Sequence, residues 1–212
     1  MYKDVLLIIR HARSDWNIRV TDKLDSDITE FGQRQSKKVG EFLLNHLHKE
    51  GVNYKDLDKF TSPFLRCLQT TAGIEKGYGQ KAGFRIEPLL REYLNHQKKH
   101  CFVPHRETEF NDFGWSQYPA EGITFEMEQN EDFLRRMHMC FHKLPPKSLV
   151  VTHGLPGLAL LRIAANPGLS DVPVYDYSLD NCSMSLIVRG RVVWHGRNVY
   201  HEIDHDPFDK YV

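Results

Sequence analysis

The stretch that decides the fold lies near the start of the chain, at residues 5–17, and reads VLLIIRHARSDWN. Its first five residues, Val5 to Ile9, are all apolar, which is typical of a strand buried on both faces of a parallel sheet. Arg10 and His11 follow directly. The pattern predicts a buried strand that brings a guanidinium and an imidazole to a sheet edge. An isolated Arg-His pair can also be only the solvated end of a strand, so the functional interpretation depends on partners elsewhere in the chain.

The composition narrows the classes of function. A chain of 212 residues is long enough for one sizeable α/β domain. Its 28 basic and 28 acidic residues give a formal net charge of +0, so no overall field attracts nucleic acid or an anionic membrane. We therefore expect neither nucleic acid nor a membrane as partner, and any affinity for anions must be local.

The cysteines and the N-terminus indicate a cytoplasmic protein. Cys67, Cys101, Cys140 and Cys182 are scattered and form no C-x-x-C pair, which favours reduced thiols over a disulfide framework or a zinc ribbon. The five apolar residues before Arg10 are too few for the core of a signal peptide or for a membrane span. We expect a cytoplasmic location.

Strand-like and helix-like stretches alternate along the chain. This order predicts a three-layer α/β/α sandwich with a mostly parallel central sheet. Helices are expected from Thr29 to about His48, from the Ser62-Pro63 pair to before Gly73, from about Phe125 to Lys143, and over Leu155 to Ala165; strands are expected at 59–61, 84–87 and 148–152, with a hairpin of 184–188 and 192–195 around 189–191.

Residues 93–124 interrupt this alternation. The segment is rich in histidine, aromatic and charged residues and shows no regular period up to Gly122. Long irregular loops in a compact domain are often functional. No linker or repeat justifies a domain boundary, so we expect one domain over 1–212 with an insertion or lid at about 93–124.

A second expected strand, 148–152, also ends in a histidine, His153, followed by Gly154. Parallel sheets of this kind bind ligands at the carboxyl ends of their strands. The two predicted strands therefore place Arg10, His11 and His153 at the edge where a ligand is expected.

At this point the sequence resembles a known family. Residues 10–17, RHARSDWN, are similar to the signature R-H-G-x-S-x-x-N of the histidine phosphatase superfamily, which includes the cofactor-dependent phosphoglycerate mutases, with Ala12 in place of the usual glycine. The resemblance implies a phosphoglycerate mutase-like fold. Further matches follow in the family's order: Thr29-x-x-Gly32-x-x-Gln35, Ser62-Pro63-x-x-Arg66-x-x-Gln69-Thr70, Leu90-Arg91-Glu92, Val151-Thr152-His153-Gly154 and the closing Asn181-x-Ser183.

The chemistry of phosphoryl transfer fits these residues. A phosphate monoester needs a nucleophile in line with the leaving oxygen, cations around the equatorial oxygens and a proton for the leaving group. We expect His11 to attack phosphorus and form a phosphohistidine, with its other ring nitrogen donating to a backbone carbonyl. Arg10, Arg66 and a protonated His153 are expected to stabilise the transferring group.

Four more residues complete the expected site. Backbone N–H groups of Gly154 and Leu155, at the start of a helix, could bind the anion. The resemblance implies Asn17 as an extra phosphate ligand and Glu92 as the group that protonates the leaving oxygen and later activates water. The expected reaction requires no metal and no cofactor. We expect the methyl group of Ala12 to be tolerated, because every charged member of the set is present.

Three functions stay open at this stage. A phosphatase is favoured over a phosphoglycerate mutase, because residues 93–97, YLNHQ, depart from the mutase pattern E-R-H-Y-G and residues 17–29 lack its Gly-Trp element. A catalytically silent binding or regulatory module of the same fold is the third. The expected substrate is a small phosphorylated molecule, with a phosphoprotein as the alternative, and the sequence leaves the oligomeric state open.

Two groups of histidines and cysteines could suggest a metal site, but we do not expect either to bind a metal. His138, Cys140 and His142 alternate along an expected helix, and alternate helical residues do not share a face. The second group is His100, Cys101 and His105. We also expect Cys67, next to Arg66, to pack in the helix and not to act as a second nucleophile.

Overall fold

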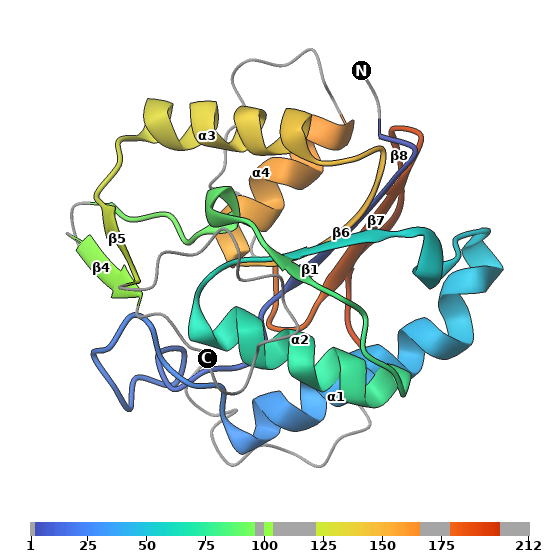
Figure 1. Ribbon diagram of the computed structural model, residues 1–212, viewed down its shortest axis with the longest axis horizontal. Helices are drawn as coiled ribbons and strands as arrows, with labels where there is room; N and C mark the ends of the chain where they lie inside the picture. Colours follow the sequence, from blue (N-terminus) through green and yellow to red (C-terminus); the bar gives the residue numbers. More distant parts are fainter. Residues whose placement is uncertain (1–2, 96–99, 104–121, 166–178, 200–212) are drawn as a thin grey trace.

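A six-stranded sheet runs through the middle of the molecule in the computed structural model, which describes residues 3–95, 100–103, 122–165 and 179–199 (Figure 1). The strand order is β3-β2-β6-β1-β7-β8. The neighbouring pairs from β3 to β1 are parallel, and β7 is antiparallel to both β1 and β8. The bounds are β1 Val5–Arg10, β2 Asp58–Thr61, β3 Arg85–Ile86, β6 Lys147–Thr152, β7 Met184–Val188 and β8 Arg191–Arg197.

Helices cover both faces of this sheet, as Figure 1 shows. Helices α1 and α2 lie on one face, and α3 and α4 lie on the other. The prediction of a three-layer α/β/α sandwich with a mostly parallel sheet is therefore confirmed. The helices are α1 Glu30–His46, α2 Leu65–Tyr78, α3 Asn130–Lys143 and α4 Gly154–Ala165, with short 3₁₀ turns η1 Leu47–Glu50, η2 Tyr54–Asp56 and η3 Pro88–Leu90.

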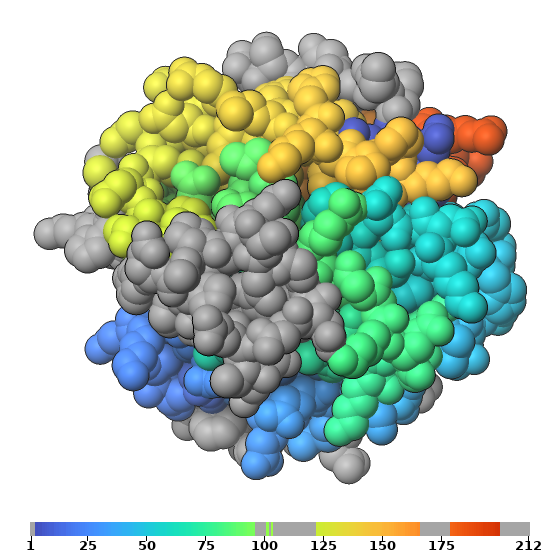
Figure 2. Space-filling model, viewed as in Figure 1, coloured from blue at the N-terminus to red at the C-terminus, as the bar shows by residue number. Residues whose placement is uncertain are grey.

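The apolar run at the start of the chain is buried on both sides, as its pattern predicts. Leu7 and Ile9 pack into the core under α1 and α2, whereas Leu6 and Ile8 pack into the core under α3 and α4. Side chains alternate between the two faces of a strand, so an uninterrupted apolar run supplies both cores. The space-filling view shows the outer residues of α3 and those of the α1–α2 layer at opposite ends of the visible face (Figure 2).

Helix α2 differs from expectation at both ends. It continues through Gly73 and Gly77 to Tyr78, because these glycines let α1 approach closely: a Cβ on Gly77 would lie 1.9 Å from the Lys37 carbonyl oxygen, and one on Gly73 would lie 1.9 Å from the Ser36 hydroxyl. Gly79, at φ 84°, ends it. The expected break near Gly73 is therefore wrong, since packing outweighs the usual cost of glycine in a helix.

The start of α2 lies at Leu65, three residues after the expected N-cap. Its N-cap position is Phe64, which has no capping side chain. Asp25 supplies the cap from a distant loop, because its Oδ1 accepts from the Leu65 N–H at 2.7 Å. Thr29, in contrast, caps α1 as predicted and accepts from the Gly32 N–H at 3.0 Å.

Part of the segment expected to be irregular forms a strand pair. β4 His100–Val103 and β5 Ile123–Glu126 are antiparallel and lie apart from the main sheet. Phe125 belongs to β5, so α3 begins five residues later than expected. Residues 96–99 and 104–121 of the proposed lid lie outside the described residues, and the lid stays a prediction. Within the described part of the chain, no helix combines the length and the apolar character needed to cross a membrane.

Candidate active site

His11 follows β1 directly and is only 2% exposed. Its backbone N–H donates to the Thr152 carbonyl at 2.8 Å, which ties it to the end of β6. Its Nδ1 lies 2.8 Å from the Ala12 carbonyl oxygen. A carbonyl oxygen only accepts, so Nδ1 carries the hydrogen and Nε2 has a lone pair. The ring is therefore held as a neutral imidazole whose Nε2 is available for attack.

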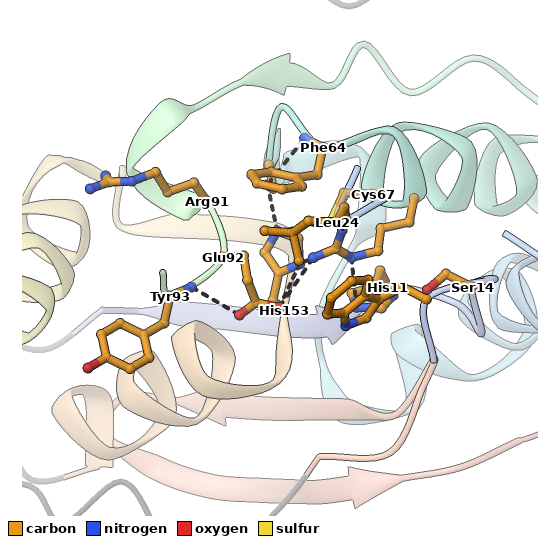
Figure 3. A network of polar contacts seen from close by, with 12 residues as sticks. His11, Ser14, Leu24, Phe64, Cys67, Arg91, Glu92, Tyr93 and His153 are labelled. Atoms are coloured by element: carbon orange, nitrogen blue, oxygen red, sulfur yellow. Dashed lines mark hydrogen bonds and ion pairs between the residues drawn. The ribbon is translucent and has the colours of Figure 1, made fainter. Parts of the chain in front are cut away.

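Arg66, in the first turn of α2, forms hydrogen bonds to several residues of the site. It is 1% exposed. Its Nε donates to His11 Nε2 at 3.2 Å, and its Nη2 lies 2.9 Å from His153 Nδ1 and 3.2 Å from Glu92 Oε2 (Figure 3). Its Nη1 donates to the Leu24 carbonyl. One guanidinium thus contacts the two histidines and the glutamate that the sequence analysis placed in the site.

His153 comes directly after β6 and is fully buried. Its ring centroid lies 5.3 Å from that of His11. Because Arg66 is always a donor, His153 Nδ1 must accept, which leaves the hydrogen on Nε2. Nε2 then donates to the Ser62 hydroxyl at 2.8 Å. His153 is neutral in this arrangement, whereas we expected it to be protonated.

Glu92 follows η3 and is 13% exposed. Its Oε1 accepts from the Tyr93 N–H at 3.0 Å, while its Oε2 faces Arg66 and lies 3.6 Å from His153 Nδ1. Figure 3 shows the carboxylate directed toward the two histidines. A carboxyl group in this place can exchange a proton with a molecule bound beside His11.

Arg10 and the start of α4 form another part of the same sheet edge. The Arg10 guanidinium donates to the Leu179 carbonyl. It also packs against Gly154, where an added Cβ would lie 3.6 Å from Arg10 Nε. Gly154 is the first residue of α4 and Leu155 the second. The first N–H groups of a helix have no partner within that helix, so the expected phosphate donors lie beside a guanidinium.

Asn17 is oriented by residues on either side of it. Its Oδ1 accepts from the Ser14 N–H at 3.1 Å, from the Ser14 hydroxyl at 2.9 Å and from Asn181 Nδ2 at 3.1 Å. Its Nδ2 is therefore the group that can donate to an anion. Asn181 also donates to the His11 carbonyl at 3.0 Å. Asn181 belongs to the closing motif of the sequence but was not among the expected site residues.

Ala12 fits the site without distortion. It is buried, and its N–H donates to Thr70 Oγ1 at 2.9 Å. Among the described residues other than glycine, a positive φ occurs at Arg19, Cys182 and Arg189. The backbone at Ala12 therefore does not require glycine, which agrees with the expected tolerance of its methyl group.

Cys67 lies close to His153, with Sγ 3.7 Å from Nε2. Burial raises the pKa of the Cys67 thiol to about 12, so the thiol is protonated at neutral pH and does not act as a nucleophile. This agrees with a packing role.

The two histidine–cysteine groups considered as metal sites can be checked only in part. In the described ranges, no group of three or more histidine, cysteine or acidic side chains could hold a metal ion. His138, Cys140 and His142 lie along α3, where Cys140 is buried and His142 is exposed. The second group falls partly outside the described residues, because it includes His105.

A protein family and several curated relatives match the sequence. Residues 6–200 match the family described as histidine phosphatase superfamily (branch 1). A probable phosphoglycerate mutase GpmB of Cronobacter sakazakii is 26% identical over 201 residues, which cover 88% of this chain and 86% of that protein. A 2,3-bisphosphoglycerate-dependent phosphoglycerate mutase of Rhizobium etli is 27% identical over 106 residues, so the match spans 43% of this chain and 50% of that mutase.

Solved structures of two phosphatases share the fold. The ecdysone phosphate phosphatase of Bombyx mori, in complex with tungstate, has a TM-score of 0.67 and 16% identity, with 92% of this chain and 93% of that chain covered. A mycobacterial glucosyl-3-phosphoglycerate phosphatase, in complex with inorganic phosphate, has a TM-score of 0.59 and 17% identity, with 92% and 98% covered. At such identities the likeness concerns the fold alone.

Proposed function

The chain belongs to the histidine phosphatase superfamily, which includes phosphatases and phosphoglycerate mutases, and on that premise we propose that it is a phosphatase that hydrolyses a phosphate monoester through a phosphohistidine on His11. The observation that carries the proposal is the tautomer of His11. Its Nδ1 faces the Ala12 carbonyl at 2.8 Å, which leaves the Nε2 lone pair directed toward Arg66. A nucleophile held beside a buried guanidinium is what phosphoryl transfer requires.

The first step transfers the phosphoryl group to the enzyme. A phosphate oxygen is a better acceptor for Arg66 than an imidazole nitrogen, so the bound substrate draws this guanidinium away from His11. Nε2 of His11 then forms a bond to phosphorus while the bond from phosphorus to the leaving oxygen breaks. Glu92 gives its proton to that oxygen. Arg10, Asn17 and the N–H groups that begin α4 hold the other phosphate oxygens, and His153 joins them by taking up a proton on Nδ1 once Arg66 has turned to the phosphate.

The second step releases phosphate. The Glu92 carboxylate takes a proton from a water molecule, and that water attacks phosphorus as the bond to His11 breaks. The products are inorganic phosphate, the free imidazole of His11 and a protonated Glu92. Neither step calls for a metal ion or a cofactor.

A phosphoglycerate mutase is the second candidate, because the two relatives described above carry that name. Residues 93–97 favour the phosphatase, since they differ from the mutase pattern at the position that follows Glu92. We propose a small phosphorylated molecule as the substrate, with a phosphoprotein as the alternative, and a cytoplasmic location. Choice among substrates is assigned to residues 93–124, most of which lie outside the described residues.

The test is hydrolysis of 4-nitrophenyl phosphate in the presence of a chelator. The wild-type protein should release phosphate, and His11→Ala should abolish the release, because the acceptor of the phosphoryl group is lost. His142→Ala, an exposed histidine on α3, is the matched control and should keep full activity. Robust activity of His11→Ala would refute the assignment.

Two further measurements separate the alternatives. Trapped phosphate that is labile in acid and stable in alkali, present on the wild type and missing from His11→Ala, excludes a silent binding module. Interconversion of 2- and 3-phosphoglycerate faster than hydrolysis would identify a mutase instead.

A further inference from the structure

A buried ion pair lies against the backbone segment that carries Glu92. Its members are Arg136, on α3 and 5% exposed, and Glu128, two residues before α3 and 6% exposed. Arg136 Nε donates to one Glu128 carboxylate oxygen at 2.9 Å, and Nη2 donates to the other. This two-point geometry fixes the relative orientation of both side chains. The pair is therefore a rigid unit.

The third nitrogen of Arg136 binds the chain just before Glu92. Nη1 donates to the Leu89 carbonyl at 2.6 Å and to the Arg91 carbonyl at 3.1 Å. The carbonyl between them, that of Leu90, accepts from Thr152 Oγ1 at 2.8 Å. Three successive carbonyls that lead to Glu92 are thus anchored from two elements, α3 and β6.

Glu128 also binds the chain after Glu92, through its backbone N–H. The backbone N–H of Glu128 donates to the Leu94 carbonyl at 2.8 Å. On the side before Glu92, the Oε2 of Glu128 accepts from Arg91 Nη2 at 3.1 Å. The segment that bears Glu92 is therefore held on both sides by a single pair of residues.

We propose that Arg136 and Glu128 are positioning residues that set the place of the Glu92 carboxylate for proton transfer, although neither contacts Arg66 or the histidines in the described contacts. The proposal rests on the proposed function, in which Glu92 is the general acid. A buried ion pair contributes little net stability, because the desolvation of both charges offsets their attraction. The main effect of this ion pair is therefore to orient the backbone segment that carries Glu92. A misplacement of a catalytic group by about 1 Å can lower the reaction rate about a hundredfold.

The acidity of the leaving group separates this role from a merely structural one. Nitrophenolate leaves without help from an acid, whereas phenolate is a stronger base and gains more from a proton in the transition state. 4-Nitrophenyl phosphate and phenyl phosphate differ little in shape. Damage to the position of Glu92 should therefore affect phenyl phosphate selectively, and general damage to the fold should affect both.

Two variants test the proposal through kcat/KM, which reports the first transfer. Arg136→Met/Glu128→Gln removes both charges of the pair together, and the amide oxygen of the new glutamine can still accept from Arg91, which pairs with Glu128 in the wild type. Arg136→Lys keeps the charge but loses the two-point contact. For each, kcat/KM on phenyl phosphate should fall about tenfold to a hundredfold, and on 4-nitrophenyl phosphate by less than about threefold. Arg135→Met removes an exposed arginine of α3 that pairs with Asp132 and should change neither value.

A cycle with Glu92→Gln checks the connection. In that background, Arg136→Lys should lower kcat/KM on phenyl phosphate no further, because the group that it positions is already lost. Equal losses on the two substrates, or full additivity with Glu92→Gln, would overturn the positioning role. A wild-type protein that hydrolyses neither substrate would contradict the proposed function instead. If the double variant fails to show a cooperative thermal transition, Arg136→Lys decides the outcome.

Discussion

Replacement of Arg66 by lysine tests whether the guanidinium fork, and not its charge alone, organises the site. Three nitrogens of Arg66 contact four acceptors: His11 Nε2 at 3.2 Å, His153 Nδ1 at 2.9 Å, Glu92 Oε2 at 3.2 Å and the Leu24 carbonyl. A single ammonium cannot reach all of these positions at once. Arg66→Lys should therefore retain the charge while losing most of the contacts.

The size of the effect follows from the bonds lost. A hydrogen bond to a charged group contributes about 1.5–3 kcal/mol. Loss of one such bond to the transferring phosphoryl group corresponds to a fall in kcat of about tenfold to 150-fold, since about 1.4 kcal/mol equals a factor of ten. Loss of the charged bond from Arg66 to the buried Leu24 carbonyl should lower the free energy of unfolding by about 1.5–3 kcal/mol.

The assay is steady-state hydrolysis of 4-nitrophenyl phosphate, with urea denaturation for stability. Arg85→Lys serves as control, because Arg85 is 52% exposed and pairs with Asp58 at the surface; its kcat should match the wild type. A kcat for Arg66→Lys within about threefold of the wild type would refute the reasoning, because charge alone would then suffice for transition-state stabilisation.

Two further predictions concern buried groups near and far from the site. Ser62→Ala leaves the buried Nε2–H of His153 without its acceptor and should lower the free energy of unfolding by about 1–3 kcal/mol in urea denaturation; unchanged stability would contradict the tautomer assigned to His153. Burial raises the pKa of the Cys140 thiol from 9.0 to about 12, so its contribution to stability is present below pH 9 and is lost as pH rises toward 12. Between about pH 8 and pH 10, Cys140→Ala should therefore lose about 1 kcal/mol less stability than the wild type, and identical pH profiles would contradict this.

The local patterns of the sequence predicted most of the fold. The apolar run that precedes Arg10 forms β1, and Thr29 caps α1. The end of α2 was predicted wrongly because local propensity treats glycine as a helix breaker. In the structure, Gly73 and Gly77 permit close contact with α1. Helix propensity can be read from one segment of the sequence, whereas helix packing depends on a second segment that lies elsewhere in the chain.

The strand pair β4–β5 was not predicted for a similar reason. His100–Val103 and Ile123–Glu126 are four residues each, too short for a clear period, and among the described strands they pair with one another and not with the main sheet. Strand pairing satisfies backbone groups over a separation along the chain that local patterns do not report.

The sequence by itself determined which chemical groups the site contains: His11, Arg66, Glu92 and His153 follow from motifs in a fixed order. Only the tertiary structure decided how they meet. His11 and Arg66 are 55 positions apart in the sequence, and Arg66 and His153 are 87 apart, yet they form hydrogen bonds that set the tautomer of each ring. Hydrogen bonds depend on the distance and direction between atoms, and those quantities exist only once the sheet has brought its strand ends to one edge. The support of Glu92 by Arg136 likewise arises from packing alone.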